Sequence, residues 1–305
     1  MKKSKIPLTD LEVSAVCLGT MTFGSPVGEA DAIKLVHQAL DRGVNFIDTA
    51  NIYEGYSRLV GNAGGEAEII LGKALKGRRD GVVVATKVGM KVGAQPEDEN
   101  ASPAAIRKNL ELSLKRLGMD RVDLYYLHRP DPVTPIVETL GALADAMRAG
   151  KIRHYALSNF SSAQLTELLR VADKNHLPRP VANQPELSML KPELAVDLLP
   201  LCARERIAVF PYQVLQGGLL TGKYRRGQPP PPGSRKTEKD QEDWIGAFDD
   251  ALFDRLEAIE GQARNAKKSM IEYAINWALQ QPAVLSVIVG VKRIQQLEEA
   301  ILAAV

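Results

Sequence analysis

Short runs of apolar residues alternate with longer amphipathic stretches along the whole chain. The stretches between the runs place apolar residues about 3.6 positions apart, which is typical of amphipathic helices. Near-continuous apolar strands that alternate with helices indicate a parallel sheet covered by helices, and eight strands close a barrel. The pattern predicts an α/β fold, a single (β/α)8 TIM barrel domain over residues 1–305. The strand-like runs are Ala15–Leu18, Val44–Ile47, Val82–Ala85, Val122–Leu127, Ile152–Leu157, Val181–Ala182, Ile207–Phe210 and Leu285–Val289.

Helix starts and loops can be read from the residues between these runs. Ser102-Pro103 and Thr134-Pro135 each resemble an N-cap followed by proline at the first helical position. Ser161 with Gln164 three residues later predicts a capping box. The rhythm breaks at 223–244, where a proline run favours a stiff loop inserted on the barrel rim over a polyproline ligand. A shorter insertion, 56–65, follows the second strand.

Charge and cysteine content exclude several classes of partner. The formal charge of +2 is the small difference between 39 basic and 37 acidic residues, which gives no reason to expect nucleic acid or an anionic membrane as partner. No run approaches the roughly 18 apolar residues of a membrane helix, and the basic first residues lack the apolar run of a signal peptide. Cys17 and Cys202 lie in apolar contexts, where two reduced, buried thiols are favoured over a disulfide. We therefore expect a cytoplasmic protein.

Polar residues stand where the second, third and fourth apolar runs end. Asp48 ends the second run and Tyr53 follows it, Lys87 ends the third, and His128 ends the fourth. Active sites of such barrels lie at the C-terminal ends of the strands. Each residue alone could be ordinary: a turn-capping aspartate, a solvated lysine, a structural histidine, a half-buried tyrosine. Their predicted convergence on one mouth favours a catalytic site.

Three competing motifs are disfavoured. Gly217–Lys223 matches the first seven positions of an ATPase phosphate loop, but Tyr224 replaces the magnesium-binding hydroxyl, and a charged proline-rich loop follows where a helix is required. No G-x-G-x-x-G occurs, so a Rossmann site is not indicated. The four histidines, at 37, 128, 154 and 176, are dispersed, and the sequence predicts no metal site.

Eight segments of the chain closely resemble the aldo-keto reductases, and they occur in family order from about Cys17 to Glu299. LYYLHRPDP and ALSNFS are the longest and most specific matches. The segments are CLGTMTFG, DRGVNFIDTANIY, LGKALKGRRD, VVVATKVG, SLKRLGMDRVDLYYLHRPDP, GKIRHYALSNFSSAQL, PYQVLQGGLLTGKY and IVGVKRIQQLEE.

The resemblance implies an NADP(H)-dependent enzyme that reduces an aldehyde or ketone, a small-molecule carbonyl substrate, to an alcohol. It implies a catalytic tetrad of Asp48, Tyr53, Lys87 and His128. Tyr53 would donate the proton, and the Lys87 ammonium would lower its pKa. Asp48 would hold Lys87 charged and in place, while His128 would hydrogen-bond the carbonyl and orient it.

The resemblance also implies a cofactor site along the strand ends. Two departures from the family pattern bear on it: Gln213-Val214 where Ser-Pro is common, and Ala300 where an adenine-binding asparagine is common. The implied contacts are Gly19, Thr20 and Met21 with Asp48 at the ribose, Ser158, Asn159 and Gln184 at the carboxamide, Tyr212 on the nicotinamide face, Gln213, Leu215, Gly217, Leu219 and Lys223 at the pyrophosphate, and Gly290, Lys292, Gln296 and Glu299 at the adenosine.

Lys292 and Arg293 follow the eighth strand directly, with no acidic residue among 289–294. Two cations at a helix start are suited to an anion, so we expect NADP(H) to be preferred over NAD(H). Two other functions stay open at this point. One is a cofactor-loaded binding or regulatory subunit, since some family members associate with channels, and the other is the same site run as an alcohol dehydrogenase. The intact tetrad favours an enzyme.

Overall fold

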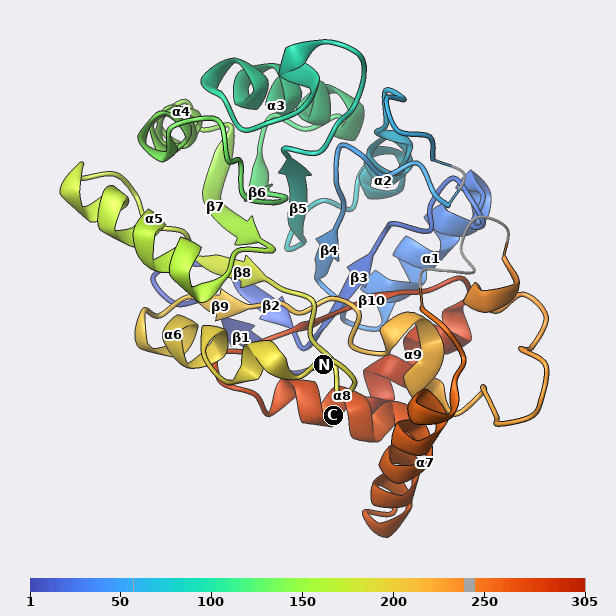
Figure 1. Cartoon of the computed structure of the whole chain (residues 1–305). Coiled ribbons are helices and arrows are strands. Elements are labelled where there is room, and N and C mark those ends of the chain that lie inside the picture. The colour runs from blue at the N-terminus through green and yellow to red at the C-terminus, as the bar shows by residue number, and fades with distance from the viewer. Residues whose placement is uncertain (57, 239–244, 305) are drawn as a thin grey trace.

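A computed structural model of the chain describes residues 1–56, 58–238 and 245–304. Its centre is a sheet of eight parallel strands in the order β10-β3-β4-β5-β6-β7-β8-β9 (Figure 1). Each strand lies at a run of buried residues, and each coincides with one of the eight predicted strands to within a few residues. The strands are β3 Val16–Gly19, β4 Phe46–Asp48, β5 Val83–Val88, β6 Val122–Leu127, β7 Ile152–Ser158, β8 Ala182–Gln184, β9 Ala208–Val209 and β10 Val287–Gly290.

The two ends of this sheet meet. The backbone N–H of Val209 in β9 donates to the carbonyl oxygen of Ala283 at 2.8 Å, and the N–H of Leu285 donates to Val209 at 3.3 Å. Both acceptor and donor lie in the segment that enters β10, so hydrogen bonds close the sheet into a (β/α)8 TIM barrel. The predicted fold class is confirmed.

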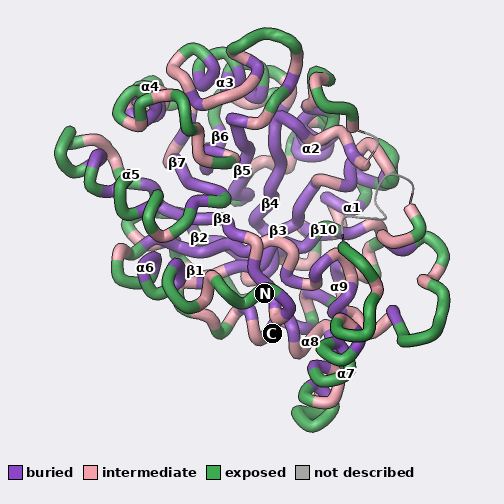
Figure 2. The backbone as a smooth tube through the Cα atoms, in the orientation of Figure 1, coloured by how far each residue is buried: buried purple, intermediate pink, exposed green. Residues whose placement is uncertain are grey.

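Helices surround the barrel and pack their apolar faces on the outer side of the strands (Figure 1). Buried residues concentrate on the strands and on the inner faces of the helices, while the outer faces are exposed (Figure 2). A helix without its own strand, α7 Asp250–Asn265, was not predicted and projects beyond the ring. The helices that follow strands are α1 Glu29–Asp41, α2 Glu66–Leu75, α3 Pro103–Leu117, α4 Ile136–Arg148, α5 Ser162–Lys174, α6 Leu198–Arg204, α8 Met270–Leu279 and α9 Ile294–Ala303.

Two of the three predicted helix starts are confirmed. The Ser102 hydroxyl accepts from Ala105 N ahead of α3, and the Ser161 hydroxyl accepts from Gln164 N ahead of α5. The prediction at Thr134-Pro135 is wrong by one residue: α4 begins at Ile136, and Pro135 is its N-cap. The reason is that Asp131 Oδ1 accepts the N–H groups of residues 133 and 134, which places the turn earlier.

The segment expected to form a rim insertion contains a short 3-10 helix, η4 Arg235–Thr237, and its residues 239–244 lie outside the described residues. The glycine-rich stretch before it forms another 3-10 helix, η3 Gln216–Thr221. An ATPase phosphate loop would lead into an α-helix, whereas the described chain after η3 has only η4 before α7. Both cysteines are buried and unpaired, as predicted. Within the described part of the chain, every helix is too short or too polar to cross a membrane.

A small hairpin that the sequence did not predict covers the N-terminal end of the barrel. Its strands are β1 Lys3–Lys5 and β2 Glu12–Ser14, paired antiparallel. Ile6 and Val13 are buried among the side chains inside the barrel, including Phe46 and Phe210. The hairpin therefore closes the end of the barrel opposite the predicted site.

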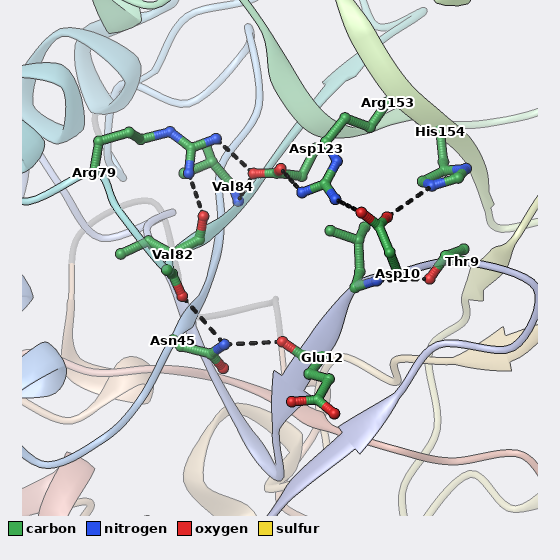
Figure 3. A network of polar contacts seen from close by, with 12 residues as sticks. Thr9, Asp10, Glu12, Asn45, Arg79, Val82, Val84, Asp123, Arg153 and His154 are labelled. Atoms are coloured by element: carbon green, nitrogen blue, oxygen red, sulfur yellow. Dashed lines mark hydrogen bonds and ion pairs between the residues drawn. The ribbon is translucent and has the colours of Figure 1, made fainter.

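Polar contacts fasten this hairpin to the strands (Figure 3). Arg153 at the start of β7 donates to Asp10 in the hairpin turn at 2.5 Å and to Asp123 at 2.9 Å. Arg79 approaches Asp123 from the other side at 2.5 Å, and the N–H of Val84 donates to the same carboxylate at 2.9 Å. Asp123 is only 3% exposed, so this carboxylate is a buried anion held by three donors.

Asp123→Ala is expected to lower the free energy of unfolding by about 3 kcal/mol, because breaking a buried ion pair costs about 3–5 kcal/mol and both arginines can still reach water. Urea unfolding followed by circular dichroism measures this. Glu111→Ala is the matched control, since its ion pair with Lys151 is solvent-exposed and should contribute under about 1 kcal/mol. Equal effects of the two substitutions would contradict a structural role for Asp123.

Candidate active site

The four tetrad candidates lie together at the C-terminal end of the barrel. Asp48 is the last residue of β4, Lys87 lies one residue before the end of β5, and His128 follows β6 directly. Tyr53 comes from the loop after β4, and its ring centroid lies 6.0 Å from that of His128 in an edge-on arrangement. Because parallel strands end at the same edge, residues far apart in the sequence meet here.

Lys87 is the centre of this group. Its Nζ donates to Oδ1 of Asp48, to the carbonyl oxygen of Thr49 at 2.8 Å and to Oη of Tyr53 at 3.3 Å. These contacts use all three ammonium protons of a side chain that is fully buried. Burial by itself lowers the pKa of Lys87, but the Asp48 carboxylate and the Tyr53 hydroxyl outweigh it and raise that pKa. Lys87 is therefore a permanent cation beside the Tyr53 hydroxyl.

Both oxygens of the Asp48 carboxylate are hydrogen-bonded. Oδ1 accepts from Lys87, and Oδ2 accepts from the side-chain amide of Gln184 in β8 at 2.9 Å. Thr20, after β3, holds the backbone of Asp48 by donating from its N–H and its hydroxyl to the Asp48 carbonyl. Gln184 was expected at the cofactor carboxamide, and the structure shows that one of its amide protons is given to Asp48.

The pKa of Tyr53 differs from the sequence expectation. Burial raises the pKa of Tyr53, and the nearby Lys87 ammonium opposes this without reversing it. The expected lowering by Lys87 is present, but the cost of burying a phenolate is larger, so the pKa of Tyr53 is raised overall. A raised pKa keeps Tyr53 protonated at neutral pH, which is the form a proton donor needs.

His128 is held neutral. Burial lowers the pKa of His128 well below its ordinary value, and the positive charges of Lys87, Arg129 and Arg58 lower it further. Its Nδ1 is buried and has no hydrogen-bond partner among the described residues. A neutral imidazole can donate one hydrogen bond without carrying a charge into the site.

This histidine gives the protein a pH-dependent stability. Below about pH 6.5, an unfolded histidine binds a proton that folded His128 does not, so the unfolded state is favoured as pH falls. When the pH falls from about 6.5 to about 5, the wild type should lose about 1.5 kcal/mol more unfolding free energy than the His128→Gln variant, which lacks this histidine. Urea unfolding at the two pH values measures it. His176→Asn is the control, because His176 is exposed and has a positive φ that asparagine accepts. This variant keeps His128 and should show the full wild-type loss; if it reduced the loss as much as His128→Gln does, the assignment would be wrong.

The residues expected at the nicotinamide form one hydrogen-bonded chain across the strand ends. Ser158 Oγ donates to the carbonyl oxygen of Gln184 at 2.8 Å. Asn159 Nδ2 donates to the carbonyl oxygen of His128 at 2.9 Å, and Asn159 Oδ1 accepts from the Tyr212 hydroxyl at 2.8 Å. Asn159 has φ of 63°, a left-handed conformation that asparagine tolerates better than most residues. The structure thus brings these residues together beside the tetrad.

The stretch expected at the pyrophosphate is a tight turn. Gly217 has φ of 62° and donates its N–H to the Gln213 side chain at 2.8 Å. Gly218 has φ of 96°, which favours glycine, and Nζ of Lys223 lies 2.5 Å from where a Cβ would stand. Leu219 is buried and Leu215 packs beside it, so the polar groups of the expected contacts are the backbone and the side chains of Gln213 and Lys223.

The adenosine end departs most from the expectation. Nζ of Lys292 donates to Oε1 of Glu238 and, at 3.1 Å, to the carbonyl oxygen of Gly233. The Gln296 side chain accepts the N–H groups of Lys292 and Arg293 and so caps α9. Glu299 is exposed, and Gly290 at the end of β10 lies beside Gly19 in β3.

Comparison with known proteins identifies the family of this chain. The model of the aldo/keto reductase family matches residues 15–305. The chain belongs to the aldo/keto reductase family. It is 33% identical to aldo-keto reductase YhdN of Bacillus subtilis, over 98% of this chain and 87% of that protein. It is also 32% identical to protein tas of Escherichia coli, over 98% and 91%, and to a probable voltage-gated potassium channel subunit beta of Arabidopsis thaliana, over 98% and 90%.

Aldo/keto reductases are oxidoreductases that act on small carbonyl compounds and generally use nicotinamide cofactors. The residues present here fit such a cofactor. Lys223, Lys292 and Arg293 supply positive charge near the glycine turn, and burial together with the neighbouring cations lowers the pKa of Lys223. A pyrophosphate offsets charge repulsion of this kind. The glycines at positions 217 and 218 let the Ile245 and Lys223 side chains pack directly against the turn.

Three contributors to this candidate site were not found from the sequence. They are the Thr49 carbonyl on Lys87, the amide of Gln184 on Asp48, and the Glu238 carboxylate on Lys292. A backbone carbonyl has no sequence signal, and the partner of Gln184 lies 136 positions away. Glu238 lies in the segment singled out as an insertion, but only the folded chain shows which residue it faces.

Proposed function

We propose that this aldo/keto reductase reduces an aldehyde or ketone to an alcohol with NADP(H), and that Tyr53 is the proton donor. The observation that carries the proposal is the buried Lys87 ammonium, which contacts both the Asp48 carboxylate and the Tyr53 hydroxyl. A structural ion pair would not need a phenol as its third partner at the mouth of a barrel. The proposed enzyme is one domain with one site. The two unpaired cysteines favour a reducing compartment such as the cytoplasm.

Each residue of the tetrad has a distinct task. When bound, the reduced nicotinamide supplies a hydride to the carbonyl carbon. Tyr53 Oη gives its proton to the carbonyl oxygen as negative charge develops there, and Lys87 at 3.3 Å stabilises the phenolate that is left. Asp48 keeps Lys87 charged and fixed. His128 Nε2 donates a hydrogen bond to the same carbonyl oxygen, since an Nδ1 proton would be buried without an acceptor.

Apolar side chains adjoin the proton donor. Ala50, Ile52 and Val92 form a small buried cluster on which Tyr53 and Met90 pack. Apolar walls beside the reacting group exclude water and favour a substrate with a hydrocarbon portion. NADP(H) is favoured over NAD(H) by Lys292 and Arg293 at the start of α9, where the helix dipole adds to their charge.

The test is NADPH oxidation by the purified chain against a panel of aldehydes, ketones, quinones and keto-sugars, with NADP⁺ and alcohols in parallel. The proposal expects saturable turnover of at least one carbonyl and faster use of NADPH than of NADH. An enzyme that oxidises alcohols but reduces no carbonyl would contradict the proposed direction.

One observation favours a second candidate, a cofactor-loaded binding subunit: the relatives include proteins named as probable potassium channel β subunits. A binding subunit has no need for a protonated Tyr53 and a neutral His128 at one mouth, so we place the enzyme first. Tight NADPH binding without turnover of any carbonyl in the same panel would reverse this order.

A further inference from the structure

The cation expected to bind the 2′-phosphate already has an anionic partner within this chain. Lys292 Nζ donates to Glu238 and to the carbonyl oxygen of Gly233. Two of the three ammonium protons of Lys292 are therefore donated to residues of the segment before residue 239. The side chains of Lys292 and Glu238 are only 23% and 19% exposed. The pair is therefore held in the protein and is not a solvated surface contact.

Glu238 is an acidic side chain within a group of basic ones. Burial lowers the pKa of Lys223, the cations of Lys292, Arg235 and Arg293 lower it further, and the Glu238 carboxylate opposes them. The Arg235 guanidinium lies 4.2 Å from the centroid of the Tyr56 ring, and Nζ of Lys292 lies 5.5 Å from the same centroid. Several cations around one small volume suit an anion with more charge than a single carboxylate.

Among the described residues, only one oxygen of the Glu238 carboxylate has a hydrogen-bond partner. Its Oε2 is buried and has no hydrogen-bond partner among the described residues. The buried Asp48 carboxylate differs, because both of its oxygens accept hydrogen bonds. Within the described part of the chain, Glu238 thus has fewer hydrogen-bond donors than Asp48, so a better-matched anion can replace its contact with Lys292.

We propose that Glu238 is a specificity-determining residue that competes with the 2′-phosphate of NADP(H) for Lys292. This rests on the proposed cofactor site. A phosphate and a carboxylate cannot share one ammonium without repelling each other, whereas a ribose 2′-hydroxyl can donate to a carboxylate, as in NAD-binding sites. Glu238 therefore reduces the preference for NADP(H) over NAD(H) that Lys292 and Arg293 would give alone, and it allows NAD(H) to bind.

NADP⁺ and NAD⁺ are suitable probes because they differ only in the 2′-phosphate, and isothermal titration calorimetry on the full chain measures their binding. Glu238→Gln is expected to tighten NADP⁺ binding by about tenfold. It should not tighten NAD⁺ binding, because the introduced amide oxygen accepts from the 2′-hydroxyl less strongly than the carboxylate does. Glu257→Gln is the matched control: it removes the same charge from a carboxylate that pairs with Arg226. The control should bind both nucleotides as the wild type does.

The gain must depend on Lys292. In a Lys292→Met background, Glu238→Gln should no longer tighten NADP⁺ binding. If Glu238→Gln bound NADP⁺ more weakly than the wild type, Glu238 would help to bind the cofactor and would not compete with it. If the variant changed the affinity for both nucleotides equally, Glu238 would have no role in specificity. Either result overturns the inference. If Lys292→Met costs NADP⁺ no affinity, the proposed NADP(H) site itself fails, whatever Glu238→Gln does.

Discussion

Replacing Tyr53 with phenylalanine is expected to lower carbonyl turnover by about 10²–10⁴-fold, because general acid catalysis typically contributes that much. The substitution removes only the hydroxyl. Lys87 keeps Asp48 and the Thr49 carbonyl as partners, and the ring keeps its contacts with the apolar cluster. Cofactor affinity and the unfolding free energy should therefore change little. Steady-state kinetics on the best carbonyl, with NADPH binding measured separately, gives both quantities.

Tyr125→Phe is the matched control for this variant. Tyr125 lies in β6, is fully buried, and its hydroxyl has no hydrogen-bond partner among the described residues. Loss of an unpartnered buried hydroxyl should leave turnover unchanged and not reduce stability. Wild-type turnover in Tyr53→Phe, or equal losses in the two variants, would exclude Tyr53 as the acid.

The pH dependence of reduction follows from the same residue. Because burial raises the pKa of Tyr53, the protonated donor persists through neutral pH. Its alkaline loss should begin above about 10, the ordinary pKa of tyrosine. In the reverse direction the phenolate is the active form, so alcohol oxidation should increase as pH rises.

The barrel could be predicted because its strands are buried on both faces. Runs such as 122–127 are buried at every position and mostly apolar, and their number and spacing specify a parallel, closed sheet. The β1–β2 hairpin was missed for the opposite reason. Its strands are three residues long and partly exposed. They are held by Ile6 and Val13, buried in the end of the barrel, and by contacts such as that of Asp10 with Arg153, 143 positions away. No local pattern encodes such a contact.

The candidate site also has features that the sequence predicts and features that it does not. Convergence of Asp48, Lys87 and His128 follows from one geometric rule, that parallel strands end at one edge of the barrel. The net pKa of Tyr53 does not follow from it, because the balance between burial and the Lys87 charge depends on the surrounding packing. Residues 289–294 contain no acidic residue, and the sequence therefore suggested that Lys292 has no anionic partner. In the folded chain, Glu238 from another segment contacts Lys292.

Lys87→Met is expected to reduce both turnover and stability, and the two effects can be separated. The substitution leaves Asp48 as an unpaired carboxylate that is 2% exposed, and breaking a buried ion pair costs about 3–5 kcal/mol. It also removes the charge that opposes burial at Tyr53, so the pKa of Tyr53 should rise further. The increase of alcohol oxidation with pH should then move to higher pH.

The double variant Asp48→Asn/Lys87→Met distinguishes catalysis from folding. Neutralising both partners removes the buried charge, while the introduced asparagine can still accept from the Gln184 amide, which donates to Asp48 at 2.9 Å in the wild type. Replacing both members of a buried ion pair is often close to neutral, so unfolding free energy should recover to within about 2 kcal/mol of wild type. Turnover should not recover, because no ammonium stabilises the phenolate of Tyr53. Recovery of turnover together with stability would mean that Lys87 only holds the barrel mouth in shape.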